Sequence, residues 1–197
     1  QIDCPDLAMT RVTQFSDLSQ EQFIKIVEIH VEVLQYALAG LAPDRMRLHL
    51  CWGNTEGPHH YDVPLKEIIN IVLKAPPLGI SFEGANPRHE HEWRVWEDIK
   101  LAEGKVLIPG VISHATNIVE HPELVAQRIE RFAGIIGRER VIAGVDCGFG
   151  TFARAGFLLF RTYALRVSVS VDYNITLVTL NDEPNPQSLN FGIGVMF

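Results

Sequence analysis

Short apolar runs alternate along most of the chain with segments in which apolar residues recur every three or four positions. The second pattern is clearest over residues 20–41, where the apolar side chains form one stripe of a helix. Ser19 and Gln22 match a capping box at its start, and Gly40 and Pro43 stop it. The pattern therefore predicts an amphipathic helix with one buried face.

Further helical and strand-like segments continue this alternation. The other predicted helices cover residues 64–73, 90–100 and 122–136. The predicted strands cover residues 1–3, 46–51, 78–83, 105–112 (with a break at Pro109) and 140–147. Strands that alternate with helices of this length indicate βα units and a parallel sheet. Five strands are fewer than the eight of a TIM (β/α)8 barrel, so a barrel would need strands encoded upstream.

The predicted strands end at polar residues or cysteines, and two of these, Glu83 and Cys147, are directly followed by glycine. These tips are Asp3, Cys51, Glu83, Ser113 and Cys147. The carboxyl ends of the strands carry the chemistry in a βα barrel, and an open doubly wound sheet also binds ligands there. Either architecture therefore predicts one site that gathers these side chains.

The pattern changes at about Arg154. Residues 165–171 and 174–180 alternate apolar and polar positions at period two, on either side of Asp172 and Tyr173. This alternation predicts a β-hairpin. We therefore divide the chain into a partial βα barrel at residues 1–153 and a β-rich tail at residues 154–197.

His49 and Cys51 form an H-x-C pair on a predicted strand. Residues i and i+2 of a strand point to the same face, so the imidazole and the thiol stand side by side, while Leu48 and Leu50 face the other way. Such a pair can share one zinc ion. It also suits a buried cysteine beside a hydrogen-bonded core histidine, so the pair alone leaves both interpretations open.

Two further residues favour the metal. Cys147 ends another predicted strand and is followed by Gly148 and Gly150, where the backbone can approach a ligand closely. Glu83 ends a third strand. A set of His49, Cys51, Cys147 and Glu83 fits a zinc site in which one ligand can leave to admit substrate.

A second group of possible ligands lies in the loops. It comprises His59, His60 and the run Arg88-His89-Glu90-His91-Glu92. We favour a polar loop and the first turn of an exposed helix for these residues, because thiolates are the better zinc ligands. They can also contact substrate or support the ligands. Cys4 is expected to be a small buried residue at a strand end.

Composition narrows the possible partners. The formal net charge of -7 argues against nucleic acid and against an anionic membrane surface. No apolar run approaches the roughly 20 residues that span a bilayer. Three cysteines do not make a disulfide framework, which suits a reducing compartment. We expect a cytoplasmic protein with small-molecule partners.

Several long motifs, in order, carry a resemblance to a known family. They are "QIDCPDLAM", "HLCWGNTEGPHHYDVPL", "SFEGANPRHEHEWRVWEDIKL", "VLIPGV" and "VIAGVDCGFGTFA". From residue 1 to about Ala153 the chain resembles the C-terminal catalytic barrel of cobalamin-independent methionine synthases. It resembles more closely their methionine synthase II-like relatives, which include epoxyalkane:coenzyme M transferase.

The resemblance implies roles for particular residues. In that family, zinc is held by the His and Cys of the H-x-C strand and by the Cys of a D-C-G motif. A Glu between them is a further ligand in methionine synthases. The resemblance therefore implies zinc at His49, Cys51, Cys147 and Glu83. The aspartate that helps to hold the amino acid substrate corresponds to Asp3. The next residue is usually Glu in the family and is Cys4 here.

The implied reaction is zinc-dependent methyl transfer from a 5-methyltetrahydropteroylglutamate to homocysteine. His114 lies in the segment that supplies the family's general acid, although its spacing from Gly110 differs, and an ordinary loop histidine is the alternative. Two other functions stay open: alkyl transfer from another electrophile, such as an epoxide, to another thiol, and an inactive zinc-binding relative. The chain opens at Gln1 inside a strand-like motif, and its tail replaces a family helix. We therefore expect a fragment that is inactive alone.

Overall fold

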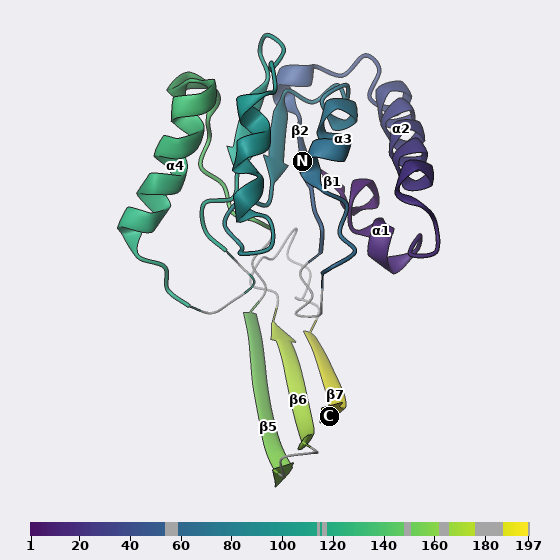
Figure 1. The fold of residues 1–197 in the computed structure, drawn as a ribbon, viewed down its shortest axis with the longest axis vertical. Helices are drawn as coiled ribbons and strands as arrows, with labels where there is room; N and C mark the ends of the chain where they lie inside the picture. Colours follow the sequence, from purple (N-terminus) through teal and green to yellow (C-terminus); the bar gives the residue numbers. More distant parts are fainter. Residues whose placement is uncertain are drawn as a thin grey trace. The chain divides into compact units, whose positions relative to one another are not determined.

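The computed structural model divides the chain into two compact units, Gln1–Gly148 and Phe149–Phe197 (Figure 1). It describes residues 1–53, 59–113, 115 and 118–147, together with the backbone of 151–161, 166–175 and 187–196. The two units are described separately below.

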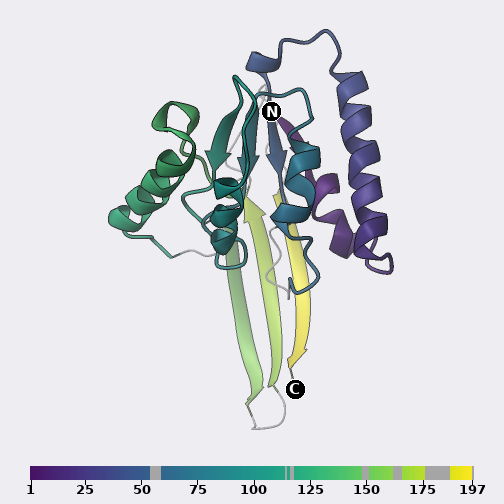
Figure 2. The same cartoon turned by 45° about the horizontal axis from the view of Figure 1, so that its top comes forward.

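The first unit is built on a parallel sheet of four strands in the order β1-β2-β3-β4. The strands are β1 (Ile2–Cys4), β2 (Arg47–Leu50), β3 (Gly79–Phe82) and β4 (Val106–Pro109). Its helices are α1 (Thr10–Thr13), α2 (Gln20–Ala37), α3 (Leu65–Val72) and α4 (Pro122–Ile136). Short 3-10 helices are η1 (Pro5–Leu7), η2 (Pro43–Arg45), η3 (Glu90–Glu97) and η4 (Arg138–Arg140). Parallel strands joined by helices make this unit an α/β structure (Figure 2).

The predicted capping box starts α2. The Ser19 hydroxyl accepts a hydrogen bond from the Gln22 N–H, and the Gln22 side chain accepts one from the Ser19 N–H. The apolar stripe buries Phe23, Val27 and Val31 against the core. The prediction of this helix is confirmed, and its regular part ends at Ala37.

Alternation along β2 separates two environments. Leu48 and Leu50 are fully buried in the apolar core, which they share with Ile68 and Ile69 of α3. His49 and Cys51 take the other face and are also buried. The period-two pattern of this strand therefore delivers the imidazole and the thiol to one side of the sheet.

The short helix predicted at residues 90–100 is present. It is a 3-10 helix, η3, over Glu90–Glu97. Glu92 and Trp96 are its buried residues, and the Glu92 carboxylate accepts a hydrogen bond from the Leu65 N–H at the start of α3. This hydrogen bond and the packing of Trp96 in the core connect η3 to the rest of the first unit.

The predicted strand at 140–147 is wrong as a regular strand. The segment runs parallel to β4 but forms two isolated bridges, Leu107 to Val141 and Gly110 to Gly144. The Ile142 N–H donates to Leu107 and the Gly144 N–H donates to Pro109. Proline has no N–H for the bond that a parallel ladder would place between these two. The ladder is therefore interrupted, while the segment keeps its place beside β4.

The second unit is a three-stranded antiparallel sheet. Its strands are β5 (Thr151–Arg161), β6 (Arg166–Ile175) and β7 (Gln187–Met196), in that order. β6 runs straight through Asp172 and Tyr173, where we expected a turn. Part of the predicted strand at 174–180 lies outside the described residues. The alternation of apolar and polar residues correctly predicted β structure here. It did not locate the turn, because the alternation continues through Asp172 and Tyr173.

Candidate metal centre

His49, Cys51 and Cys147 meet at the carboxyl end of the parallel sheet. One ligand atom from each lies within 4.8 Å of the others, and the two Sγ atoms are 3.8 Å apart. His49 and Cys51 are buried, and Cys147 is half-buried. Cys147 arrives from the segment that pairs with β4, so residues almost a hundred positions apart form one cluster.

One nitrogen of His49 is held by the protein. Its Nδ1 lies 3.2 Å from Oγ of Ser81, the residue of β3 that pairs with His49 in the sheet. Its Nε2 is buried and has no hydrogen-bond partner in the part of the chain that the structure describes. A metal-binding histidine is often oriented through its other nitrogen, so Nε2 is the atom available for a metal.

The Cys51 thiol is held in its neutral form by its surroundings. The side-chain hydrogen bond with Cys147 and burial raise its pKa, in that order, whereas the Gly53 N–H, 3.3 Å from Sγ, lowers it. Gly53 has a φ of 96°, a conformation that favours glycine. A divalent cation reverses the preference for the neutral thiol, because it coordinates the thiolate.

Glu83 lies beside the three residues. Its Oε1 accepts the Trp52 N–H at 2.9 Å and is 3.9 Å from Sγ of Cys51. Its Oε2 accepts a hydrogen bond from Nδ2 of Asn86 at 2.5 Å. Burial is the main cause of its raised pKa. Both oxygens of Glu83 thus have protein donors, and direct coordination stays a prediction.

Asp146 joins the segment before Cys147 to the end of β3. Its carboxylate is fully buried and accepts the N–H groups of Gly84 and Ala85 at 2.8 Å, and Nδ2 of Asn86 at 3.3 Å. A side chain at Gly110 would overlap Asp146 Oδ1, which explains the glycine there. Sequence reasoning missed Asp146 and Asn86. Asp146 directly precedes Cys147, and Asn86 follows Glu83 by three residues. This closeness in the sequence could have identified both as neighbours of the site.

Two further residues singled out in the sequence, Asp3 and Cys4, lie on β1, the strand next to β2. Asp3 is exposed on β1, pairs with His49 in the parallel register, and accepts a hydrogen bond from Gln1 at 2.5 Å. His114 lies outside the described residues. Cys4 is buried, as expected, and burial followed by the charges of Asp6 and Asp3 raises its pKa to about 12.

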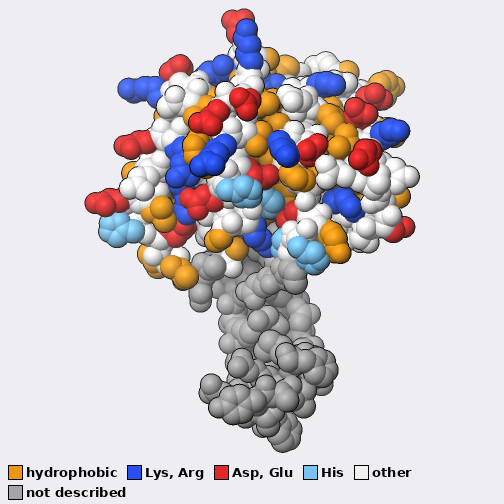
Figure 3. All heavy atoms as spheres, in the orientation of Figure 1, with side chains coloured by type: hydrophobic (Ala, Val, Ile, Leu, Met, Phe, Trp, Pro, Cys, Tyr) orange, Lys and Arg blue, Asp and Glu red, His pale blue; other side chains and the backbone are white. Residues whose placement is uncertain are grey.

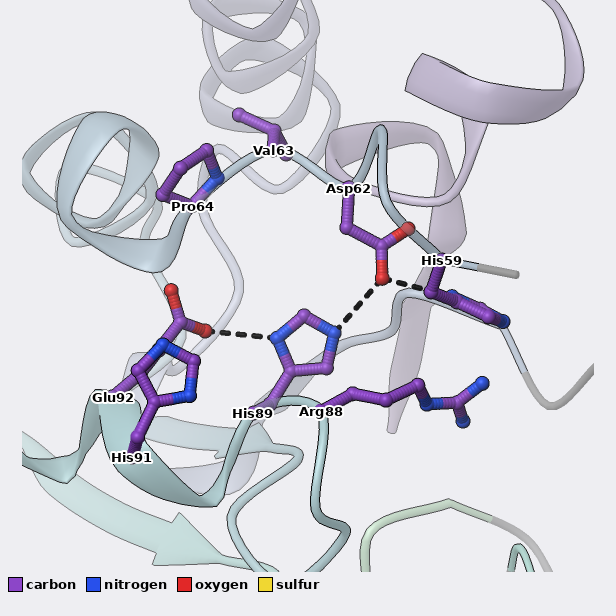
Figure 4. Close-up of a pocket in the computed structure, with 8 residues that line it drawn as sticks. All are labelled: His59, Asp62, Val63, Pro64, Arg88, His89, His91 and Glu92. Carbon is purple, nitrogen blue, oxygen red and sulfur yellow. Dashed lines mark hydrogen bonds and ion pairs between the residues drawn. The ribbon is translucent and has the colours of Figure 1, made fainter.

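A polar pocket of about 460 Å³ opens between the loop after β2 and the start of η3 (Figure 4). It is lined by His59, Asp62, Val63, Pro64, Arg88, His89, His91 and Glu92. Its wall touches the residue that follows Cys51: the rings of Trp52 and His89 pack with centroids 4.5 Å apart. We expected these residues in a polar loop and in the first turn of an exposed helix. The side chains of His59, His89 and Glu92 are instead buried, and with Arg88 and His91 they line this pocket.

Acidic and basic side chains are interspersed over the visible face of the first unit (Figure 3). In the described part of the chain, no helix has the length and apolar character needed to cross a bilayer.

Comparison with known proteins gives one solved structure to report. The chain is similar to a B12-independent methionine synthase from Shewanella sp. W3-18-1 in complex with selenomethionine, with 21% sequence identity and a TM-score of 0.49. The match covers 74% of this chain and 40% of that chain, so this chain spans less than half of that protein's length. No protein-family model matches, and no curated protein matches.

Proposed function

We propose that the first unit is part of a (β/α)8 barrel that holds one zinc ion and activates a thiol for alkylation. The observation that carries this proposal is the convergence of His49, Cys51 and Cys147, with the buried Nε2 of His49 lacking any other partner among the described residues. The motif resemblance described above supports the same ion and the same class of reaction.

The donor set suits zinc. Two thiolates bound at about 2.3 Å with tetrahedral angles lie about 3.8 Å apart, which matches the spacing between Cys51 and Cys147. One imidazole and two sulfurs are typical zinc ligands, and three protein ligands leave a fourth position for substrate. Glu83, 3.9 Å from Cys51, can take that position when substrate is absent.

The chemistry divides between the ion and the protein. Bound zinc would lower the pKa of a substrate thiol so that the thiolate nucleophile forms near neutral pH. Ser81 orients the His49 ring, while Trp52 and Asn86 hold the Glu83 carboxylate. Asp3, on the strand beside His49, is proposed to bind the amino group of an amino acid thiol. His114 is proposed as the acid that protonates the leaving group.

The proposed substrates are homocysteine and a methyltetrahydropteroylglutamate. The resemblance supports this pair, whereas Cys4 departs from the glutamate usual in methionine synthases. Another thiol and electrophile, such as an epoxide, is therefore the second candidate. Product formation from each pair, without cobalamin, separates the two. Turnover of neither pair by a complete zinc-loaded protein would leave the inactive zinc-binding relative.

Metal content tests the centre itself. We expect wild type and Cys4→Ser to retain about one zinc per chain, and Cys51→Ser and Cys147→Ser to lose it, because a neutral hydroxyl poorly replaces a thiolate. Cys4→Ser is the control, since Cys4 is a buried cysteine at another strand end. Equal zinc content in all four proteins would refute the assignment.

A further inference from the structure

Cys51 and Cys147 bring two thiols together from distant parts of the chain, with their Sγ atoms 3.8 Å apart and no disulfide between them. We propose that a peroxide converts this pair into a disulfide and that the bond switches the metal centre off. The disulfide itself requires no metal, whereas its effect on zinc rests on the function proposed above.

The distance between the two sulfurs suits closure of the bond. A disulfide is about 2.05 Å long, so the Sγ atoms must approach each other by about 1.8 Å. A change of rotamer at either cysteine moves its sulfur by a comparable distance. The segment before Cys147 is also paired with β4 through isolated bridges only, so a continuous ladder does not hold it as it holds β2. Closure therefore leaves the regular strands of the sheet in place.

The two sulfurs differ in their access to solvent, which gives the reaction an order. Cys51 is 7% exposed, whereas Cys147 is half-buried. The Cys147 thiol therefore reacts first with hydrogen peroxide and gives a sulfenic acid and one water molecule. The Cys51 sulfur then attacks the sulfenic sulfur, forms the S–S bond and releases a second water molecule. The two thiols lose two hydrogen atoms, and the peroxide is reduced to water.

The disulfide and a zinc ion compete for the same two sulfurs. Zinc binds cysteine as the thiolate, and a sulfur in a disulfide carries no negative charge. Oxidation would therefore remove two of the three clustered ligands and leave the imidazole of His49. Reduction of the bond would restore both thiols, so the centre would hold zinc only under reducing conditions.

Cys4 is an internal reference for this reaction. It pairs with Leu50 in the parallel register and packs with it in the apolar core. Cys51 follows Leu50 and takes the other face of the sheet. A general oxidation of buried cysteines would include Cys4, whereas a reaction of the close pair would leave it as a thiol.

Thiol alkylation and peptide mapping of the full chain test the bond. Zinc-free protein is treated with an equimolar amount of hydrogen peroxide, and the remaining thiols are alkylated. We expect one disulfide within the chain, between Cys51 and Cys147, with Cys4 alkylated. Cys4→Ser should form the same bond and Cys51→Ser should form none; if the second variant does not fold, the map of wild type decides. A bond to Cys4, a bond between two chains, or a sulfinic acid at Cys147 beside an intact Cys51 thiol would overturn the proposal.

Zinc titration tests the consequence for the metal centre. Reduced wild type should bind about one zinc per chain, the oxidised chain should bind none, and removal of the disulfide with a phosphine should restore binding. Zinc binding by a reduced chain that forms no disulfide would overturn the switch and leave the zinc centre in place. A disulfide in a chain that binds no zinc when reduced, or that binds zinc equally before and after oxidation, would overturn both.

Discussion

The candidate metal centre and the polar pocket are both clusters of buried polar side chains in the first unit, but they balance their charges differently. In the pocket, the His89 imidazolium and a guanidinium offset the carboxylates of Asp62 and Glu92. At the centre, none of the described groups that shift the Cys51 pKa is a cation, and a neighbouring thiol and carboxylate both raise it. The pocket thus contains its own cations, whereas the centre would receive its positive charge from the zinc ion proposed above.

The largest expected effect follows from removing that ion. Zinc binding to a folded thiolate site adds directly to folding free energy. We expect a chelator to lower the free energy of unfolding of the zinc-loaded protein by several kcal/mol, measured by urea denaturation. In Cys51→Ser the chelator should change nothing. The same loss in wild type and Cys51→Ser would place the effect away from this centre.

A pH effect should belong to the pocket. Burial by itself lowers the pKa of His89, but the hydrogen bonds to Asp62 and Glu92 outweigh it and raise the pKa to about 9. Because the folded pKa of His89 is about 9 and its ordinary value is 6.5, the stabilisation is complete below about pH 6.5 and is lost as pH rises through about 9. A shift of this size corresponds to about 3 kcal/mol. Urea denaturation at pH 6, 7.5 and 9 measures it.

Lys105 works in the opposite direction and requires a control. Burial lowers its pKa to about 8 although its Nζ donates to the carbonyls of Ala75 and Pro77, so its contribution improves as pH rises from about 8 to 10.5. The difference in the free energy of unfolding between wild type and His89→Gln at each pH cancels the Lys105 contribution, because both proteins contain Lys105. His91→Gln, the exposed neighbour, should follow wild type. A His89→Gln profile parallel to that of wild type would exclude His89 as the source.

A smaller effect should distinguish support of the centre from general stability. Asp146→Asn keeps the size of the side chain but weakens the bonds to Gly84 and Ala85 that position the segment before Cys147. Loss of such a supporting group typically lowers metal affinity 10- to 100-fold. Competition with a chromophoric chelator measures the change. Asp98→Asn, on an exposed residue, is the control, and equal affinity in both variants would remove Asp146 from the centre.

The smallest predicted effect lies away from both clusters. Ser19→Ala removes the hydroxyl of the α2 capping box and should cost about 1 kcal/mol of stability. Zinc affinity and the pH profile should stay as in wild type. A change in either would mean that the two clusters are coupled to the whole unit, and would weaken any local interpretation of the other variants.

The sequence predicted features that depend on neighbouring residues. The capping box and apolar stripe located α2, and alternation in β2 placed His49 and Cys51 on one face. The Asp146 and His89 networks escaped prediction. Asp146 binds groups about 60 residues away, and His89 binds Asp62 27 residues away, so no local pattern records these contacts. Pro109 was recognised as a break in its own strand, but its effect on the segment at 141–147 depends on their pairing.

Pro109 also makes the two sides of the centre mechanically unequal. Cys51 follows a strand that is paired on both sides, whereas Cys147 follows a segment that is tied to the sheet by isolated bridges and by Asp146. An ion bound by both sulfurs would therefore link β2 to the segment at 141–147, where backbone pairing is interrupted. Amide hydrogen exchange should then be slower at residues 141–147 in the zinc-bound protein than in the zinc-free protein, while β2 exchanges at the same rate in both.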